Sequence, residues 1–143
     1  MKKEFEEIKS NLKKLYEDLL NTVDQYINSF SNSELLSFGI SKEEAKEKIK
    51  QYERFISGMA VCMGNVDSQV ARLTKLLYSF YDINDEEMVK NIGEIILKQD
   101  RYKAIISDFM ESCEKGISRK EKKASPQALQ RNAIALKQKI SSL

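Results

Sequence analysis

The longest unbroken pattern in the sequence is a run of apolar residues, spaced alternately three and four apart, over residues 49 to 80. The run consists of Ile49, Tyr52, Ile56, Met59, Met63, Val66, Val70, Leu73, Leu77 and Phe80. This spacing places one stripe of side chains along a single α-helix and is typical of coiled-coil packing. A chain with a helix of about 40 residues, ~60 Å long, favours a bundle of long helices over other architectures.

The segment from Phe55 to Val66 (FISGMAVCMGNV) lies in the middle of this run and contains two glycines. A turn at Gly58 or Gly64 would change the phase of the apolar pattern. Because the phase is the same on both sides, we predict one continuous helix over residues 42–81. Each interior glycine costs about 1 kcal/mol relative to alanine, so packing must compensate. Gly64, with Ala60 four residues earlier, would allow another backbone to approach closely.

The apolar character of this segment also extends beyond the stripe. Val61 falls on the outermost face, and a helix that is apolar on all sides is surrounded by protein. Either other helices of the same chain or a second subunit would enclose it. We favour a homodimer, with the self-association residues Phe55, Met59, Val61, Cys62 and Met63.

Three further long elements follow from the same periodicity and from helix-capping signals. The apolar spacing predicts helices over residues 2–30, 85–115 and 126–142. Ser41 and Asn84 are the expected N-caps of the second and third helices, because each is followed three residues later by a glutamate. Ser125 and Pro126 supply a cap and a first-turn proline for the last helix. A short helical turn within residues 31–41 should connect the first two helices.

These elements predict an all-α fold, an antiparallel bundle of three long heptad-patterned helices plus a shorter C-terminal helix. Residues 1–116 would form the helical bundle, residues 117–125 a mobile basic connector, and residues 126–143 a C-terminal amphipathic helix. Short connections force neighbouring helices to run in opposite directions. The second helix is longer than the first, so its apolar end should project unless the last helix or another subunit covers it.

The chain lacks the residues on which most active sites depend. It contains no histidine, and its five glycines are scattered. This argues against histidine-based catalytic triads, ordinary zinc sites and phosphate-binding glycine loops. Acidic pairs occur early in helices, where carboxylates favour the positive end of the helix dipole. We therefore predict that the protein is not an enzyme and has no catalytic residue, no cofactor and no metal.

Two weak metal patterns have simpler explanations. Residues 82–86 (DINDE) resemble the start of a calcium loop, but the expected glycine and distal carboxylate are absent, and helix capping explains the same residues. Met59, Cys62 and Met63 offer soft ligands for Cu(I). Because all three continue the apolar pattern, we favour core packing for them.

Charge is unevenly distributed along the chain. Residues 114–143 hold eight basic and two acidic residues, a net charge of +6, whereas residues 1–113 hold 16 basic and 20 acidic residues, a net charge of −4. This asymmetry suggests an anionic partner for the tail or contact with the chain's own acidic surface. The anion-binding candidates are Arg119, Lys120, Lys122, Lys123 and Arg131. A solvated linker is the favoured interpretation, because no aromatic residues follow residue 117 to stack on bases.

The cysteines and the N-terminal segment give information about the cellular compartment in which the protein is located. Cys62 and Cys113 lie inside apolar patterns without the close spacing of a metal or redox site, so we predict buried, reduced thiols. No stretch approaches the ~20 apolar residues of a membrane span, and the charged N-terminal segment does not resemble a signal sequence. We expect no membrane span and a cytoplasmic location.

The best candidate for a partner surface is an aromatic cluster near the end of the second helix. It comprises Leu76, Tyr78, Phe80 and Tyr81. Aromatic residues are enriched in binding hot spots, although cover by a neighbouring helix is the simpler explanation. We predict a non-enzymatic helical interaction protein, an adaptor, scaffold or chaperone-like binder that takes a helical protein partner in apolar helix grooves. The alternative is a nucleic-acid-associated protein with a dimerising bundle and a basic C-terminal segment that contacts phosphate.

Overall fold

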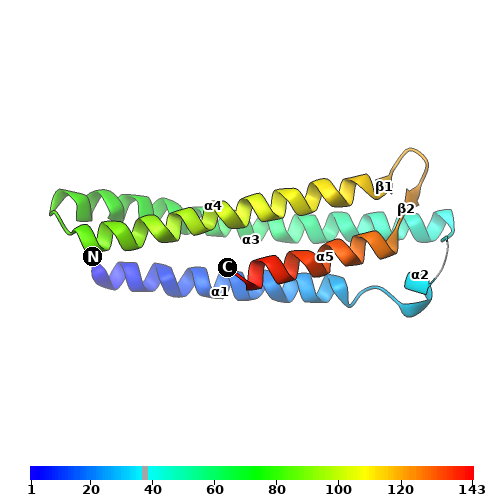
Figure 1. Cartoon of the computed structure of the whole chain (residues 1–143), viewed down its shortest axis with the longest axis horizontal. Coiled ribbons are helices and arrows are strands. Elements are labelled where there is room, and N and C mark those ends of the chain that lie inside the picture. The colour runs from blue at the N-terminus through cyan, green and yellow to red at the C-terminus, as the bar shows by residue number, and fades with distance from the viewer. Residues whose placement is uncertain (37–38) are drawn as a thin grey trace.

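The periodic segments of the sequence form four long helices in the computed structural model, which describes residues 1–36 and 39–143 (Figure 1). The long helices are α1 (Lys2–Ile27), α3 (Lys42–Asp82), α4 (Glu86–Lys115) and α5 (Pro126–Ser141), and a short helix, α2 (Asn32–Leu36), lies between α1 and α3. A short antiparallel hairpin of β1 (Ile117–Ser118) and β2 (Lys123–Ala124) joins α4 to α5. The predicted all-α fold class is confirmed. Residues 117–125, predicted to be a basic connector, contain this hairpin.

Two helices begin at the predicted caps. Ser41 Oγ accepts a hydrogen bond from the Glu44 backbone N–H at 3.1 Å, and Ser125 Oγ accepts one from the Ala128 N–H at 3.3 Å. Pro126 stands at the start of α5, where its missing N–H costs nothing. FISGMAVCMGNV lies within the single helix α3, as its phase predicted.

The cap of α4 differs from the prediction by one residue. The cap is Asp85, whose Oδ1 accepts a hydrogen bond from the Met88 N–H at 3.2 Å. Asn84 instead adopts a left-handed conformation, with φ of 58°. Asparagine tolerates this conformation better than most residues, and here it turns the chain from α3 into α4.

The long helices form a ring in which α1 contacts α3, α3 contacts α4, α4 contacts α5, and α5 contacts α1. Neighbouring helices run in opposite directions, so α1 and α4 are parallel (Figure 1). Helix α5 has 16 residues and α4 has 30. It therefore lies along only the end of the bundle near the hairpin, and the chain ends near the middle (Figure 1). We call the two ends the four-helix part and the three-helix part.

Each part has its own hydrophobic core. The core of the four-helix part consists of Leu19, Val23, Tyr26, Phe30, Tyr52, Phe55, Met59, Tyr102, Ile106, Phe109, Cys113, Leu129, Ala133, Leu136 and Ile140. The core of the three-helix part consists of Phe5, Ile8, Leu12, Val66, Leu73, Leu76, Phe80, Met88 and Ile92. None of the helices in the described ranges is long and apolar enough to cross a membrane.

The sequence analysis expected the apolar C-terminal end of α3 to project unless the last helix or another subunit covers it, and in the structure α1 and α4 cover its apolar side. Leu76 and Phe80 are buried against Phe5 of α1 and Met88 of α4 in the three-helix core. The close backbone approach expected at Gly64 is also not made within the described chain, because a side chain there would meet no atom within 4 Å.

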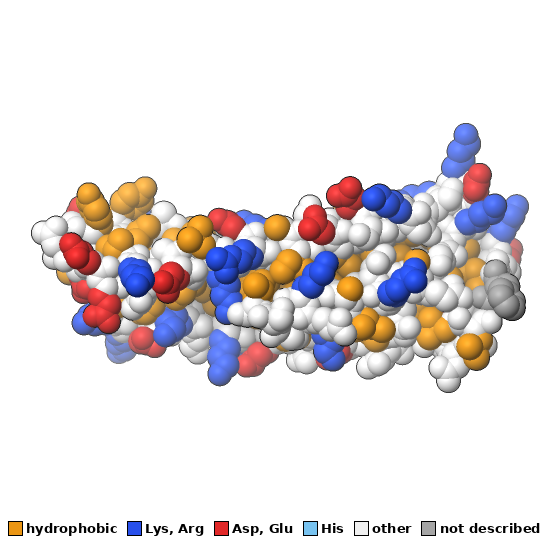
Figure 2. Space-filling model, viewed as in Figure 1, with side chains coloured by type: hydrophobic (Ala, Val, Ile, Leu, Met, Phe, Trp, Pro, Cys, Tyr) orange, Lys and Arg blue, Asp and Glu red, His pale blue; other side chains and the backbone are white. Residues whose placement is uncertain are grey.

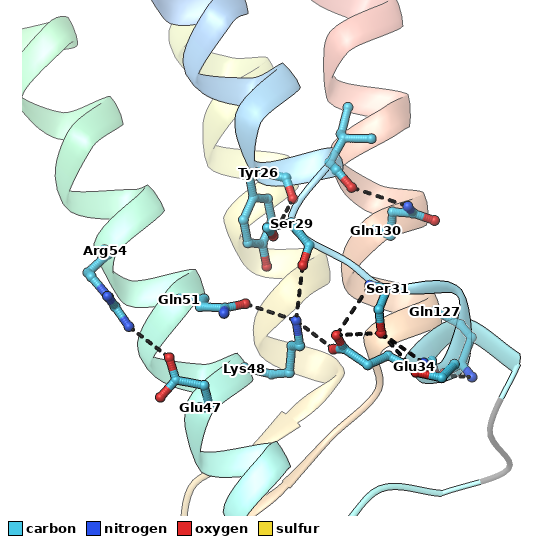
Figure 3. Close-up of polar contacts among 12 residues, drawn as sticks. Tyr26, Ser29, Ser31, Glu34, Glu47, Lys48, Gln51, Arg54, Gln127 and Gln130 are labelled. Carbon is cyan, nitrogen blue, oxygen red and sulfur yellow. Dashed lines mark hydrogen bonds and ion pairs between the residues drawn. The ribbon is translucent and has the colours of Figure 1, made fainter.

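A buried lysine of α3, Lys48, binds residues of α2 and of the segment that follows α1 (Figure 3). Lys48 Nζ lies 2.5 Å from Glu34 Oε2, and it donates hydrogen bonds to Gln51 Oε1 at 2.9 Å and to the Ser29 carbonyl oxygen at 3.5 Å. Burial lowers the pKa of Lys48, and the adjacent Glu34 carboxylate favours the charged form of the lysine. Breaking this pair by changing one partner would leave a buried charge uncompensated.

Candidate partner-binding groove

A groove between α1 and α4 begins where α5 ends. It has a volume of about 330 Å³, and its apolar lining consists of Leu12, Tyr16, Leu20, Ile95 and Tyr102. Its walls are the same two helices between which α5 packs in the other half of the molecule. The groove is therefore the unfilled continuation of the channel that holds α5.

The filled half of this channel shows what kind of segment fits it. Helix α5 buries Leu129, Ala133, Leu136 and Ile140, at spacings of three and four, on the face toward the bundle. Because α5 is 14 residues shorter than α4, about 21 Å of the channel extends past it at 1.5 Å per residue. The groove itself is lined by residues 9–20 of α1 and 95–102 of α4.

The floor of the groove is a contact between Tyr16 of α1 and two residues of α4. The Tyr16 hydroxyl donates a hydrogen bond to Gln99 Oε1, and its ring stacks on the ring of Tyr102 with the centroids 4.0 Å apart. Gln99 is only 4% exposed and donates from Nε2 to the Ile95 carbonyl oxygen at 2.9 Å. Burial raises the pKa of Tyr16, so its hydroxyl keeps the proton that it donates. These contacts hold α1 and α4 together at the point where α5 ends, so the groove is pre-formed.

The rim of the groove is mostly basic. Lys9, Lys13 and Lys98 line it, with Glu17 as the acidic member. On the face shown in Figure 2, hydrophobic side chains lie between basic ones over the middle of the bundle, near the point where α5 ends in Figure 1. An apolar floor with charged edges is the usual form of a site for an amphipathic helix.

The aromatic cluster predicted as a partner surface is divided by the structure. Leu76 and Phe80 are core residues and are not accessible to a partner. Tyr78 and Tyr81 are 67% and 69% exposed and lie on the surface near the α3–α4 turn. The neighbouring Ile83, which the sequence analysis did not select, is also exposed.

The residues predicted for self-association are enclosed mainly by their own chain. Phe55 and Met59 are buried in the four-helix core, and Cys62 and Met63 are half-buried against it. Only Val61, at 68% exposed, faces solvent among these five. The chain's own helices therefore account for the apolar segment, and the homodimer stays a prediction without this support.

The basic candidates for anion binding are partly paired with acidic residues. Arg119 Nη1 lies 2.6 Å from Glu114 Oε2, and its Nε lies 3.1 Å from Glu53 Oε1. Lys123 Nζ lies 3.7 Å from Glu121 Oε2. The remaining three candidates are exposed, with Lys120 and Lys122 on the hairpin and Arg131 on α5.

Both cysteines are free thiols. Cys113 is fully buried, and burial raises its pKa from 9.0 to about 12. Cys62 is half-buried, with Sγ 3.2 Å from the Leu15 carbonyl oxygen. Within the part of the chain that the structure describes, no three Cys, Asp or Glu residues lie close enough together to hold a metal ion.

The sequence analysis did not find the groove, although one signal for it was present. The predicted lengths of the third and last helices already differed by about half. That difference did not show which helices the last one packs between, so it gave no position for the uncovered surface. Comparisons with known proteins find no family whose model matches the chain, and no match among curated proteins or solved structures.

Proposed function

We propose that this protein is a non-enzymatic interaction protein, an adaptor, scaffold or chaperone-like binder, and that it takes an amphipathic helix of a partner protein into the groove between α1 and α4. The observation that carries the proposal is that α5 fills only half of the channel between these helices. The partner helix would occupy the other half, end to end with α5.

The energetics favour reversible binding. A partner that fully buries three large apolar side chains in the groove gains about 5 to 9 kcal/mol from their removal from water. Loss of translational and rotational freedom opposes association by at least ~4 kcal/mol. The groove is therefore suited to a partner that binds reversibly rather than to a permanent subunit.

A cytoplasmic location is part of the proposal, because two free thiols suit a reducing compartment.

A designed peptide tests the proposal without knowledge of the natural partner. The probe is a helical peptide of about 14 residues, with leucines at the spacing of the α5 apolar face and one tryptophan among them. The protein contains no tryptophan, so the fluorescence of the peptide reports its burial alone. We expect a blue shift that saturates as the full-length protein is added.

Two substitutions on α4 localise the binding. Ile95 lines the groove, whereas Leu97, two residues away, is exposed on another face of the same helix. Ile95→Glu should weaken peptide binding at least about tenfold, since it places a charge among apolar contacts, and Leu97→Glu should leave binding unchanged. Ile95→Ala serves where the glutamate variant does not fold. Equal binding by both glutamate variants, or no binding by the unmodified protein, would refute the proposal.

The alternative, a nucleic-acid-associated protein, depends on the basic hairpin. Of the five anion-binding candidates, Arg119 and Lys123 already form ion pairs with acidic residues of the chain. Salt-sensitive binding of a DNA or RNA duplex that is lost on changing Lys120 and Lys122 to glutamine would favour this alternative. The predicted homodimer is tested separately, by measuring the solution mass of the unmodified protein with light scattering coupled to size exclusion. A mass of one chain would contradict it.

A further inference from the structure

We propose that the helix bound by this groove carries acidic residues on both flanks of its apolar stripe. This inference rests on the proposed function, because it specifies the partner of the same groove. It comes from the position of two lysines on opposite walls and from the composition of the groove lining, in which three lysines accompany one glutamate.

The contact of Tyr16 with α4 shows how α1 and α4 are aligned along the axis of the bundle. Tyr16 touches both Gln99 and Tyr102, and α1 and α4 run in the same direction. Lys13 lies about one turn before Tyr16 on α1, and Lys98 lies about one turn before Tyr102 on α4. The two lysines therefore stand at about the same level, one on each side of the groove.

These lysines have little to neutralise them. Among the residues that the structure describes, neither Lys13 nor Lys98 forms an ion pair, and the Lys98 ammonium lies 6.0 Å from the centre of the Tyr102 ring. Lys9, one turn earlier on α1, lies 4.0 Å from Glu6 at the limit of an ion pair. Glu17 is the acidic residue of the lining, and it lies on the Lys13 wall toward α5. The charged side chains that line the groove are therefore lysines on both walls and one carboxylate, Glu17, toward the end of α5.

A helix that lies between two such walls places the residues next to its apolar stripe against the lysines. These are the positions that carry charge pairs between helices of a coiled coil. Glutamate there pairs with Lys13 on one side and Lys98 on the other, glutamine leaves both lysines without partners, and lysine brings like charges together. The groove should therefore select the charge on the flanks as well as the apolar seam.

Three peptides of one design test this selection. They share the leucine seam and the tryptophan described above and differ only at the flanking positions, which are all glutamate, all glutamine or all lysine. We expect the glutamate peptide to bind about fivefold tighter than the glutamine peptide, and the lysine peptide to bind weakest. The preference should shrink at high salt, because these ion pairs are exposed.

Charge reversal in the protein gives the decisive comparison. The double variant Lys13→Glu with Lys98→Glu should invert the order of the peptides, so that the lysine peptide binds best. The matched control, Lys120→Glu with Lys122→Glu, makes the same change in net charge on the hairpin and should leave the order as it was. If the reversed variant does not fold, Lys13→Gln with Lys98→Gln should abolish the preference instead.

The outcomes separate the two proposals. If none of the peptides binds, the proposed function fails and this inference fails with it. If all three bind equally well, the groove binds helices, but its lysines do not select acidic flanks, and this inference alone is wrong. Loss of the preference in the hairpin variant would place the acidic contact on the hairpin and would also overturn the inference.

Discussion

The four-helix and three-helix parts of this bundle share α1, α3 and α4 but fill their centres differently. In the four-helix part, aromatic rings occupy the space between the helices, with Phe55 stacked on Tyr26 at 4.3 Å and edge-on to Phe109 at 5.7 Å. Among the residues that the structure describes, the three-helix core is mostly aliphatic, with Phe5 and Phe80 as its buried aromatic members and Tyr16 packed against it at the boundary. A fourth helix enlarges the centre that side chains must fill to interior density. Where it stops, the remaining three close over a smaller core and leave a groove on the surface.

Removal of α5 should give the largest difference between the two parts. A chain that ends at Lys115 loses the burial of Leu129, Leu136 and Ile140, which is worth about 5 kcal/mol or more in unfolding free energy. Amide hydrogen exchange should show loss of protection around Phe55 and Phe109, with protection kept around Phe80. Equal loss along the whole of α3 would contradict the division into two parts.

Alkaline pH should destabilise the four-helix part first. Burial raises the pKa of Cys113 from 9.0 to about 12, and it also raises the pKa values of Tyr26 and Tyr52. A raised pKa means that the folded state holds the proton more tightly than the unfolded state. The stabilisation is complete below pH 9 and is lost above it, by up to about 1.4 kcal/mol per pH unit for Cys113.

The variant Cys113→Ala isolates that contribution. Its unfolding free energy should fall less steeply than that of the unmodified protein between pH 9 and 10, because the tyrosines, with an ordinary pKa of 10.0, contribute equally to both proteins and only the cysteine differs. Urea denaturation followed by circular dichroism at several pH values measures both slopes. Identical slopes would show that Cys113 does not couple proton release to unfolding.

Two tyrosines, the half-buried Tyr16 and the buried Tyr26, should respond in opposite ways to loss of the hydroxyl. Tyr16, at the boundary of the two parts, donates to Gln99, whereas the Tyr26 hydroxyl in the four-helix core has no hydrogen-bond partner in the described structure. Tyr16→Phe should cost about 1 to 2 kcal/mol, because it leaves a buried amide oxygen unpaired. Tyr26→Phe should be neutral or stabilising by up to about 1 kcal/mol. Urea denaturation of the two variants measures the difference, and an equal cost for both would contradict these hydrogen-bond assignments.

The sequence predicted the helices well because the apolar period and the capping residues act locally. Ser41 and Ser125 cap where expected, and the unbroken phase through Gly58 and Gly64 correctly indicated one helix. The error at Asn84 arose because Asn84 and Asp85 are both good caps. The choice between them depends on which residue adopts the left-handed turn, and that is set by the packing of α3 against α4.

The groove and the burial of the α3 segment depend on how distant helices pack. Phe55 and Met59 suggested a second subunit because the sequence does not show that the chain's own helices enclose them. Lys48 gave no sign of burial, since its carboxylate partner Glu34 lies on a separate short helix. Gln99 stands at a position of the α4 apolar stripe, but its hydrogen-bond donor, Tyr16, lies 83 residues away. Contacts of this range are visible only in the folded chain.

The most direct test of the groove is to fill it covalently. A helical extension of about 14 residues, fused after Leu143 to continue α5 and carrying the leucine seam with glutamate flanks, has a high effective concentration at the site. We predict that it raises the unfolding free energy by a few kcal/mol, and that Ile95→Glu removes this gain while Leu97→Glu does not. An extension that leaves the unfolding free energy unchanged would contradict the claim that the groove between α1 and α4 accepts a helix.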